Sequence, residues 1–235
     1  MSHEIEQNLA DIQERIARAA ERSGRPPSEI ELVAVTKHRS IELTDAVLEA
    51  GQRILGENRV SEAVQKIEHY EKASFQPPIE WHFIGHLQSR KAKDIVGRVA
   101  MIHSVDSLKL AETLQRRADM VETTVNFLMQ FNVSGEASKY GLAPENAVEV
   151  IDGLATLDRI RCRGLMTMAP FYDDPERTRP VFRRLRELRD RLGQMNREYL
   201  DLRHLSMGMT NDFEVAVEEG ATLVRVGTAI FEGTD

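Results

Sequence analysis

Residues 32–37, Leu-Val-Ala-Val-Thr-Lys, form an apolar run that ends in a lysine. β-Branched residues occupy three of its first five positions, which is typical of a buried strand. A helical pattern at 41–50 and a short β-like run at 53–55 follow it. This β-α-β order favours two parallel strands that are joined by a helix.

The same alternation continues along the chain. Further β-like runs lie at 80–84, 100–104, 124–131, 159–165, 202–206 and 222–226. Helical patterns separate them at 58–73, 87–97, 107–119, 144–154, 175–199 and 211–219. An amphipathic helix at 4–22 precedes the first strand, and Gly24 and the Pro26-Pro27 pair end it.

Regular β-α alternation predicts an α/β fold with a parallel sheet. No linker or low-complexity tract divides the 235 residues. We therefore predict one (β/α)8 barrel of the TIM type over residues 1–235, with a leading helix and turn at 1–27. An open, doubly wound sheet is the alternative, because the second strand is short.

Composition narrows the function classes. The net charge is −7 at pH 7, and both nucleic acids and anionic membranes favour basic partners. Cys162 is the sole cysteine, so no intrachain disulfide can form, and the N-terminus lacks the features of a signal peptide. No apolar stretch approaches the ~18 residues that span a bilayer. We expect a cytoplasmic protein without nucleic-acid or membrane partners.

Lys37 is the first candidate site residue. In barrels of this kind function belongs to the loops after the strands. A lysine at the end of a buried strand would be partly desolvated and therefore more nucleophilic. Its commonest chemistry is a Schiff base, either with a substrate carbonyl or with pyridoxal phosphate. An ordinary strand-end lysine in solvent is the alternative.

Polar and glycine residues at the exits of the last two strands predict a phosphate site, because such barrels commonly build one there. Gly208 and Gly227 would let the backbone approach an anion, and Ser206 and Thr228 would add hydroxyl donors. Tight turns are the alternative use of these glycines. Barrel closure would place Lys37 beside them. A Schiff-base lysine next to a phosphate site suits either pyridoxal phosphate or the phosphorylated carbonyl substrate of an aldolase.

Arg225 lies inside the last strand, between Val224 and Val226. A buried guanidinium must find partners. It could pair with a carboxylate such as Glu57, or donate to a cofactor ring nitrogen. The second arrangement would keep that nitrogen unprotonated and weaken the ring as an electron sink.

Three other features have weaker signals. His82 and His86 are four residues apart, but a strand and Gly85 intervene, so we expect no metal site. The polar loop at 134–141 suits either a flap over the site or a surface connection. Residues 211–214, Asn-Asp-Phe-Glu, have the spacing of a capping box.

Taken together, the motifs resemble the YggS/PROSC family of pyridoxal 5′-phosphate homeostasis proteins, over nearly the whole chain. The matching segments are 32–37 (LVAVTK), 56–58 (GEN), 81–88 (WHFIGHLQ), 103–107 (HSVDS), 132–136 (NVSGE), 164–168 (GLMTM), 205–209 (LSMGM), 212–214 (DFE) and 226–231 (VGTAIF). The chain departs from the family pattern at His38, Arg59 and Glu232.

The resemblance implies a fold type III barrel, like the N-terminal domain of alanine racemase. It implies an aldimine between Lys37 and pyridoxal 5′-phosphate, and a pyridine nitrogen that faces Arg225. By the same resemblance Asn58 lies near the ring, and Ser206, Gly227 and Thr228 bind the phosphate. We expect four further residues near the site, namely His82, Met166, Met207 and Gly208.

The family is known for binding and buffering this cofactor without established turnover. We therefore expect a carrier and regulator in vitamin B6 and amino-acid homeostasis, a monomer whose partners include apo-enzymes. A pyridoxal-phosphate enzyme of the amino-acid racemase type is the alternative. A racemase needs acid/base groups on both faces of the ring, and no tyrosine occupies an assigned strand exit. The resemblance disfavours the aldolase.

Overall fold

A closed barrel of eight parallel strands, paired in sequence order from β1 to β8, forms the centre of the molecule. The computed structural model describes residues 2–136, 139–197 and 199–234. The strands are β1 (Glu31–Val35), β2 (Ile54–Glu57), β3 (Glu80–Phe83), β4 (Met101–Val105), β5 (Val125–Gln130), β6 (Ile160–Met166), β7 (Leu200–Met209) and β8 (Leu223–Val226). Parallel pairing of β1 with β8 closes the barrel, which confirms the predicted architecture and rules out the open sheet.

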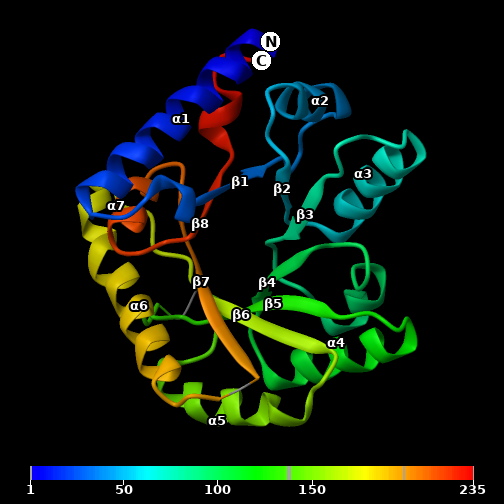
Figure 1. The fold of residues 1–235 in the computed structure, drawn as a ribbon, viewed down its shortest axis with the longest axis vertical. Helices are drawn as coiled ribbons and strands as arrows, with labels where there is room; N and C mark the ends of the chain where they lie inside the picture. Colours follow the sequence, from blue (N-terminus) through cyan, green and yellow to red (C-terminus); the bar gives the residue numbers. More distant parts are fainter. Residues whose placement is uncertain (1, 137–138, 198, 235) are drawn as a thin grey trace.

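Helices cover the outside of the barrel (Figure 1). The α-helices are α1 (Ser2–Arg22), α2 (Ile41–Glu49), α3 (Val60–Lys72), α4 (Leu108–Met120), α5 (Ala147–Gly153), α6 (Arg179–Gly193) and α7 (Phe213–Glu218). The short 3-10 helices are η1 (Pro27–Glu29), η2 (Ser89–Asp94), η3 (Pro144–Asn146), η4 (Leu154–Thr156), η5 (Pro175–Thr178) and η6 (Thr228–Phe231).

Two helix predictions were wrong in kind or length. The segment 87–97 contains the 3-10 helix η2 and no α-helix. Its buried residues Ala92 and Ile95 are three apart, a spacing that a 3-10 helix places on one side. The helix predicted over 175–199 divides into η5 and α6, and α6 ends at Gly193.

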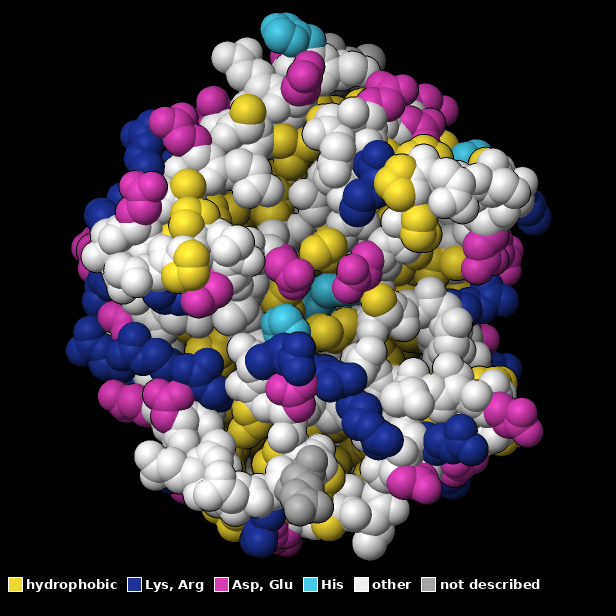
Figure 2. Space-filling model, in the orientation of Figure 1, with side chains coloured by type: hydrophobic (Ala, Val, Ile, Leu, Met, Phe, Trp, Pro, Cys, Tyr) yellow, Lys and Arg dark blue, Asp and Glu magenta, His cyan; other side chains and the backbone are white. Residues whose placement is uncertain are grey.

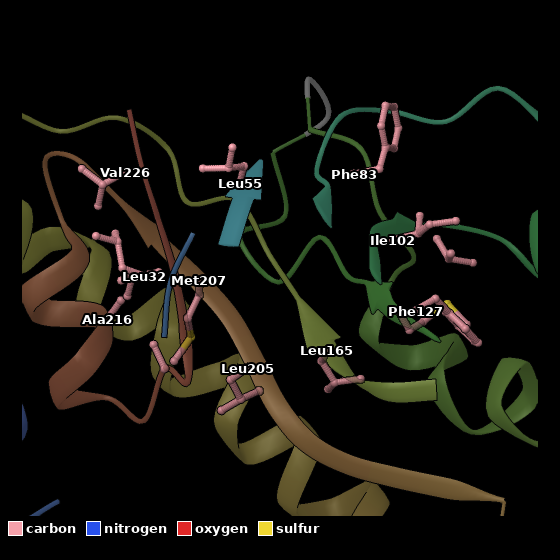
Figure 3. Close-up of a cluster of buried hydrophobic side chains, with 14 of the residues drawn as sticks. Leu32, Leu55, Phe83, Ile102, Phe127, Leu165, Leu205, Met207, Ala216 and Val226 are labelled. Atoms are coloured by element: carbon pink, nitrogen blue, oxygen red, sulfur yellow. The ribbon is translucent and has the colours of Figure 1, made fainter. Parts of the chain in front are cut away.

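Alternate strand residues face opposite sides of the barrel wall. Outward residues such as Leu32, Leu55 and Leu205 join the core between the strands and the helices (Figure 3). Inward apolar residues form a separate small cluster that includes Val33 and Met166. The barrel wall therefore separates a large apolar shell from a narrow interior.

Helix α1 secures the segment that follows β8. Its apolar stripe is buried, with Ile5, Ile12 and Ile16 at most 2% exposed. Asn8 Nδ2 on the same helix donates to the backbone oxygens of Ile230 and Glu232 at 3.1 and 3.0 Å. The two ends of the chain accordingly lie together in Figure 1.

Strand β7 and helix α7 meet at Gly208, which has a φ of +90°. A Cβ atom there would lie 2.5 Å from Ala216 Cβ and 2.9 Å from Phe213 Cα. The glycine thus permits both a left-handed backbone and direct contact between strand and helix.

We expect Gly208→Ala to lower the free energy of unfolding more than Gly51→Ala does. Gly51 has a similar φ of +91° but open space around its Cβ position, so the matched pair separates steric overlap from backbone strain. The overlap should add about 1–3 kcal/mol. Urea unfolding of both variants measures the difference, and equal losses would contradict the close strand–helix contact.

Candidate functional site

Lys37 is the second residue after β1, at the carboxyl end of the barrel. Its side chain is exposed, and no hydrogen bond or ion pair engages its ammonium within the described parts of the chain. The expectation of a partly desolvated lysine was therefore wrong, because the buried run ends at Thr36. The amine is free to react with a carbonyl ligand.

A buried ion pair fixes the backbone beside Lys37. Lys66 Nζ donates to Glu57 Oε1 and to Thr36 O, both at 2.7 Å. Thr36 Oγ1 donates to the same carboxylate oxygen at 2.6 Å. Thr36, Glu57 and Lys66 are 0, 1 and 6% exposed. This cluster joins the exits of β1 and β2 to helix α3, which fixes the position from which Lys37 extends.

The segment after β8 lies directly against the exit of β1. Val33 aligns with Arg225 and Ala34 with Val226, and a Cβ atom on Gly227 would lie 3.1 Å from Val35 O. Thr228 is exposed and begins η6, so the first N–H groups of this turn have no intrahelical partner. The predicted neighbourhood of Lys37 and the Gly227–Thr228 segment is confirmed.

Ser206 lies elsewhere than predicted. Strand β7 continues three residues beyond it, to Met209, and Ser206 aligns with Leu223. Leu223 precedes Gly227 by four residues, or roughly 13 Å of strand at about 3.3 Å per residue. Ser206 is fully buried at this depth, so its expected position at the strand exit beside Gly227 was wrong.

Thr210 is the hydroxyl residue that does follow β7. Met209 aligns with Arg225, which places Thr210 beside Val226 at the same edge as Gly227. The sequence prediction missed it because the strand was ended at residue 206. If the strand had been predicted to continue through Gly208, Thr210 would have been the predicted hydroxyl donor.

Arg225 points into the barrel and is 4% exposed. It donates to Ser206 Oγ and, at 3.1 Å, to Thr167 O. Burial lowers the pKa of Arg225 to about 10, and the charge of Asp212 opposes this effect. The group therefore stays cationic at neutral pH, and a guanidinium has five N–H donors, so donors remain for a ligand.

The alternative partner of Arg225 is excluded. Glu57 faces outward from β2 and pairs with Lys66. Within the described part of the chain, no carboxylate forms an ion pair with Arg225; its two acceptors are uncharged. The cation is thus held by neutral oxygens.

Two histidines extend the polar interior below Arg225. His103 Nδ1 lies 2.8 Å from Ser206 Oγ, and His103 Nε2 lies 2.9 Å from His82 Nδ1. Burial holds the pKa of His103 well below its ordinary value, and the neighbouring His82 and Arg225 act in the same direction. His103 was not predicted as a site residue, although it lies two residues after the inward-facing Met101 on the same strand.

The remaining candidates divide between the site and the core. Asn58 follows β2, and its Oδ1 is buried without a partner among the described residues. Met166 belongs to the inner cluster. Met207 packs in the outer shell, near Leu32 and Ala216 in Figure 3, so its expected place at the site was wrong. Gly208 is buried against α7.

Loops after β3, β4 and β5 also meet at this edge. His86 Nδ1 lies 3.2 Å from Asp106 Oδ2, and its ring stacks on Tyr140 with centroids 4.3 Å apart. The loop at 134–141 includes residues 137 and 138, which lie outside the described residues, so its role as a flap stays a prediction.

The expected cap of α7 can be compared directly with the structure. The predicted capping box does not form, since Asp212 Oδ1 accepts from Met209 N at 2.7 Å and no side chain caps α7. Among the described residues, no group of three or more metal-ligating side chains occurs. No helix in the described ranges is both long and apolar enough to cross a membrane.

An orphaned amide oxygen, a free amine and a cation with spare donors surround one edge of the barrel. The amine suits an aldehyde, the cation suits a ring nitrogen acceptor, and the free N–H groups of the Gly227–Thr228 segment suit a phosphate. A family model described as alanine racemase, N-terminal domain, matches residues 7–235.

Sequence relatives identify the family to which the chain belongs. The pyridoxal phosphate homeostasis protein of Aquifex aeolicus is 43% identical and covers 96% of each chain. That of Escherichia coli K12 is 37% identical over 99% of this chain and 98% of its own. The chain belongs to the YggS/PipY family of pyridoxal phosphate homeostasis proteins, as the resemblance implied.

Solved structures agree with this assignment. PipY of Synechococcus elongatus, solved with pyridoxal phosphate bound, is 35% identical, covers 97% of this chain and 99% of its own, and has a TM-score of 0.82. An alanine racemase of Clostridium difficile has a TM-score of 0.75 at 16% identity, and this chain covers 56% of it. The second comparison shows the shared barrel fold alone.

We expect Lys66→Met to lower the free energy of unfolding by about 3–5 kcal/mol, because Glu57 would keep a buried charge without its partner. Lys66→Met combined with Glu57→Leu should cost clearly less than the sum of the two single changes. Urea unfolding measures each variant, with the exposed Lys72→Met on the same helix as control. Additive losses would show that the pair does not act as a unit.

Proposed function

We propose that this protein binds pyridoxal 5′-phosphate through an aldimine with Lys37 and acts as its carrier and regulator. The observation that carries the proposal is the free amine of Lys37 beside the Gly227–Thr228 segment, with Arg225 on the neighbouring strand. The bound cofactor in the PipY structure supports it.

Each part of the cofactor has a matching group. The phosphate would accept hydrogen bonds from the backbone N–H groups of Gly227 and Thr228 and from the hydroxyls of Thr210 and Thr228. Arg225 would donate to the pyridine nitrogen, and Asn58 would contact the ring through its unsatisfied amide. Helix α1 would hold the phosphate segment in place through Asn8.

Arg225 would keep the bound cofactor catalytically quiet. A pyridine nitrogen that accepts from a permanent cation stays unprotonated, and the ring is then a weak electron sink. Neutral oxygens accept the hydrogen bonds of Arg225, and among the described residues no carboxylate forms an ion pair with it, although the charge of Asp212 acts on it from farther away. The protein would therefore store and deliver the cofactor, and apo-enzymes in the cytoplasm would receive it from the monomer.

An amino-acid racemase is the second candidate function. The His86–Asp106 pair favours it, since a histidine oriented by a carboxylate is a common general acid/base. This pair stands at the edge of the barrel that carries Lys37. Exchange of an amino acid's α-hydrogen distinguishes the two functions.

Lys37→Ala should abolish the visible absorbance of the bound cofactor and leave the fold intact, because the variant lacks the amine. Borohydride reduction of the loaded wild type should add the reduced cofactor to the Lys37 peptide, as mass spectrometry would show. Lys72→Ala, an exposed lysine on α3, serves as control and should load normally. A Lys37→Ala protein that stays yellow after dialysis would refute the assignment.

Arg225→Glu should raise the exchange of the α-hydrogen of L-alanine with heavy water, since an acidic partner lets the ring nitrogen protonate. Arg225→Gln removes the cation without supplying an acid and should raise the exchange less. Proton NMR follows the exchange, and the visible spectrum confirms loading of each variant. Rapid exchange by the wild type would favour the racemase over the carrier.

A further inference from the structure

A chain of hydrogen bonds crosses the barrel interior from Arg225 to Glu80. The guanidinium contacts Ser206, which contacts His103, which contacts His82. His82 Nε2 then lies 3.1 Å from Glu80 Oε1 at the start of β3. Glu80 is half-exposed, whereas the three residues between it and Arg225 are at most 1% exposed.

The chemistry of the groups fixes the direction of these bonds. Arg225 can only donate, so Ser206 Oγ accepts from it, and the serine hydroxyl hydrogen is directed to His103 Nδ1. Burial lowers the pKa of His103, which is therefore neutral and carries its proton on Nε2. That proton is donated to His82 Nδ1, and His82 Nε2 donates to Glu80.

The opposite direction would bring two acceptors together. With His103 protonated on Nδ1, a His82 ring with a single proton would donate from Nδ1 and turn a bare Nε2 toward Glu80. The hydrogen bond from His82 lowers the pKa of Glu80, so this carboxylate is ionised and accepts only. Reversal also leaves the Ser206 hydroxyl hydrogen without an acceptor among the described residues.

We propose that Ser206, His103 and His82 are positioning residues for Arg225, and that they form a relay of aligned hydrogen bonds from Glu80. This relay sets the orientation and donor strength of the guanidinium from the opposite mouth of the barrel. The inference rests on the proposed function, because it assigns Arg225 to the ring nitrogen of the cofactor.

Other charged groups surround the outer end of the relay. Glu31 begins β1 and interacts with Glu80 and His82, and its pKa is raised mainly by burial. His204, whose pKa burial lowers, also interacts with His82, and Arg163 lies close enough to act on His204. Acidic, histidine and basic side chains also gather at the centre of the face in Figure 2. Within the described chain, the relay has no hydrogen bond to Glu31, His204 or Arg163. Glu31 therefore provides a matched control for Glu80.

The first experiment needs no cofactor. Nitrogen-15 NMR of the histidine rings in the cofactor-free protein should show a proton on Nε2 and none on Nδ1 for both His82 and His103. A proton on Nδ1 of either ring would overturn the relay. This outcome is independent of whether pyridoxal phosphate binds.

The second experiment uses the protein loaded with pyridoxal phosphate labelled with nitrogen-15 in its ring. Ser206→Ala should shift the ring-nitrogen resonance most and weaken cofactor binding by about threefold to tenfold, as for one hydrogen bond. Glu80→Ala should shift the resonance less and in the same direction. Glu31→Ala should leave it unchanged, although it removes a charge from the same mouth.

The outcomes separate the two proposals. A ring-nitrogen resonance that neither Ser206→Ala nor Glu80→Ala moves, in protein loaded at Lys37, would overturn the relay and leave the proposed function standing. Equal shifts with Glu31→Ala and Glu80→Ala would overturn it too, because they would indicate a through-space field. Failure of the wild type to take up the cofactor would refute the proposed function and the cofactor end of the relay, while the histidine protons still decide the order of its bonds.

Discussion

The interior of this barrel is arranged around one buried cation. Arg225 loses its hydration on a strand where its neighbours Val224 and Val226 belong to the apolar shell. The fold stabilises the charge with neutral oxygens, and Asp212 lowers the cost from farther away. Because an ion pair would have neutralised the guanidinium, this solution leaves its full charge available at the carboxyl end of the barrel. The polar residues on β3, β4 and β7 follow from the same constraint.

The architecture could be predicted from the sequence because strand and helix patterns alternate eight times within one barrel's length. The ends of the elements were harder to predict. Gly208 suggested a turn, yet it continues β7 with a positive φ where α7 packs against the strand. In the segment 87–97 an apolar spacing of three suited a 3-10 helix as well as an α-helix. Only tertiary contacts decide between such local alternatives.

The candidate site, like the fold, could be predicted only in part. Lys37, Arg225 and Gly227 were expected near one another because closure makes β1 and β8 neighbours, and the register of the two strands agrees with this expectation. Ser206 was placed too near the mouth because one strand end was misjudged, and Thr210 was missed for the same reason. The inward direction of His103 could have been read from its parity with Met101. The pairing of Lys66 with Glu57 could not have been predicted from the sequence, because it depends on how helix α3 lies against the barrel.

The pairing of β1 with β8 also determines when, during synthesis, the candidate site can form. During synthesis Lys37 precedes Thr228 by roughly 190 residues, or about 10 to 40 s at about 5–20 residues per second. Until β8 is made, one edge of β1 has no strand beside it, and Asn8 has no carbonyls of residues 230 and 232 to bind. A ligand that requires both edges therefore cannot guide the folding of the growing chain. It can be captured only by a barrel that has already closed.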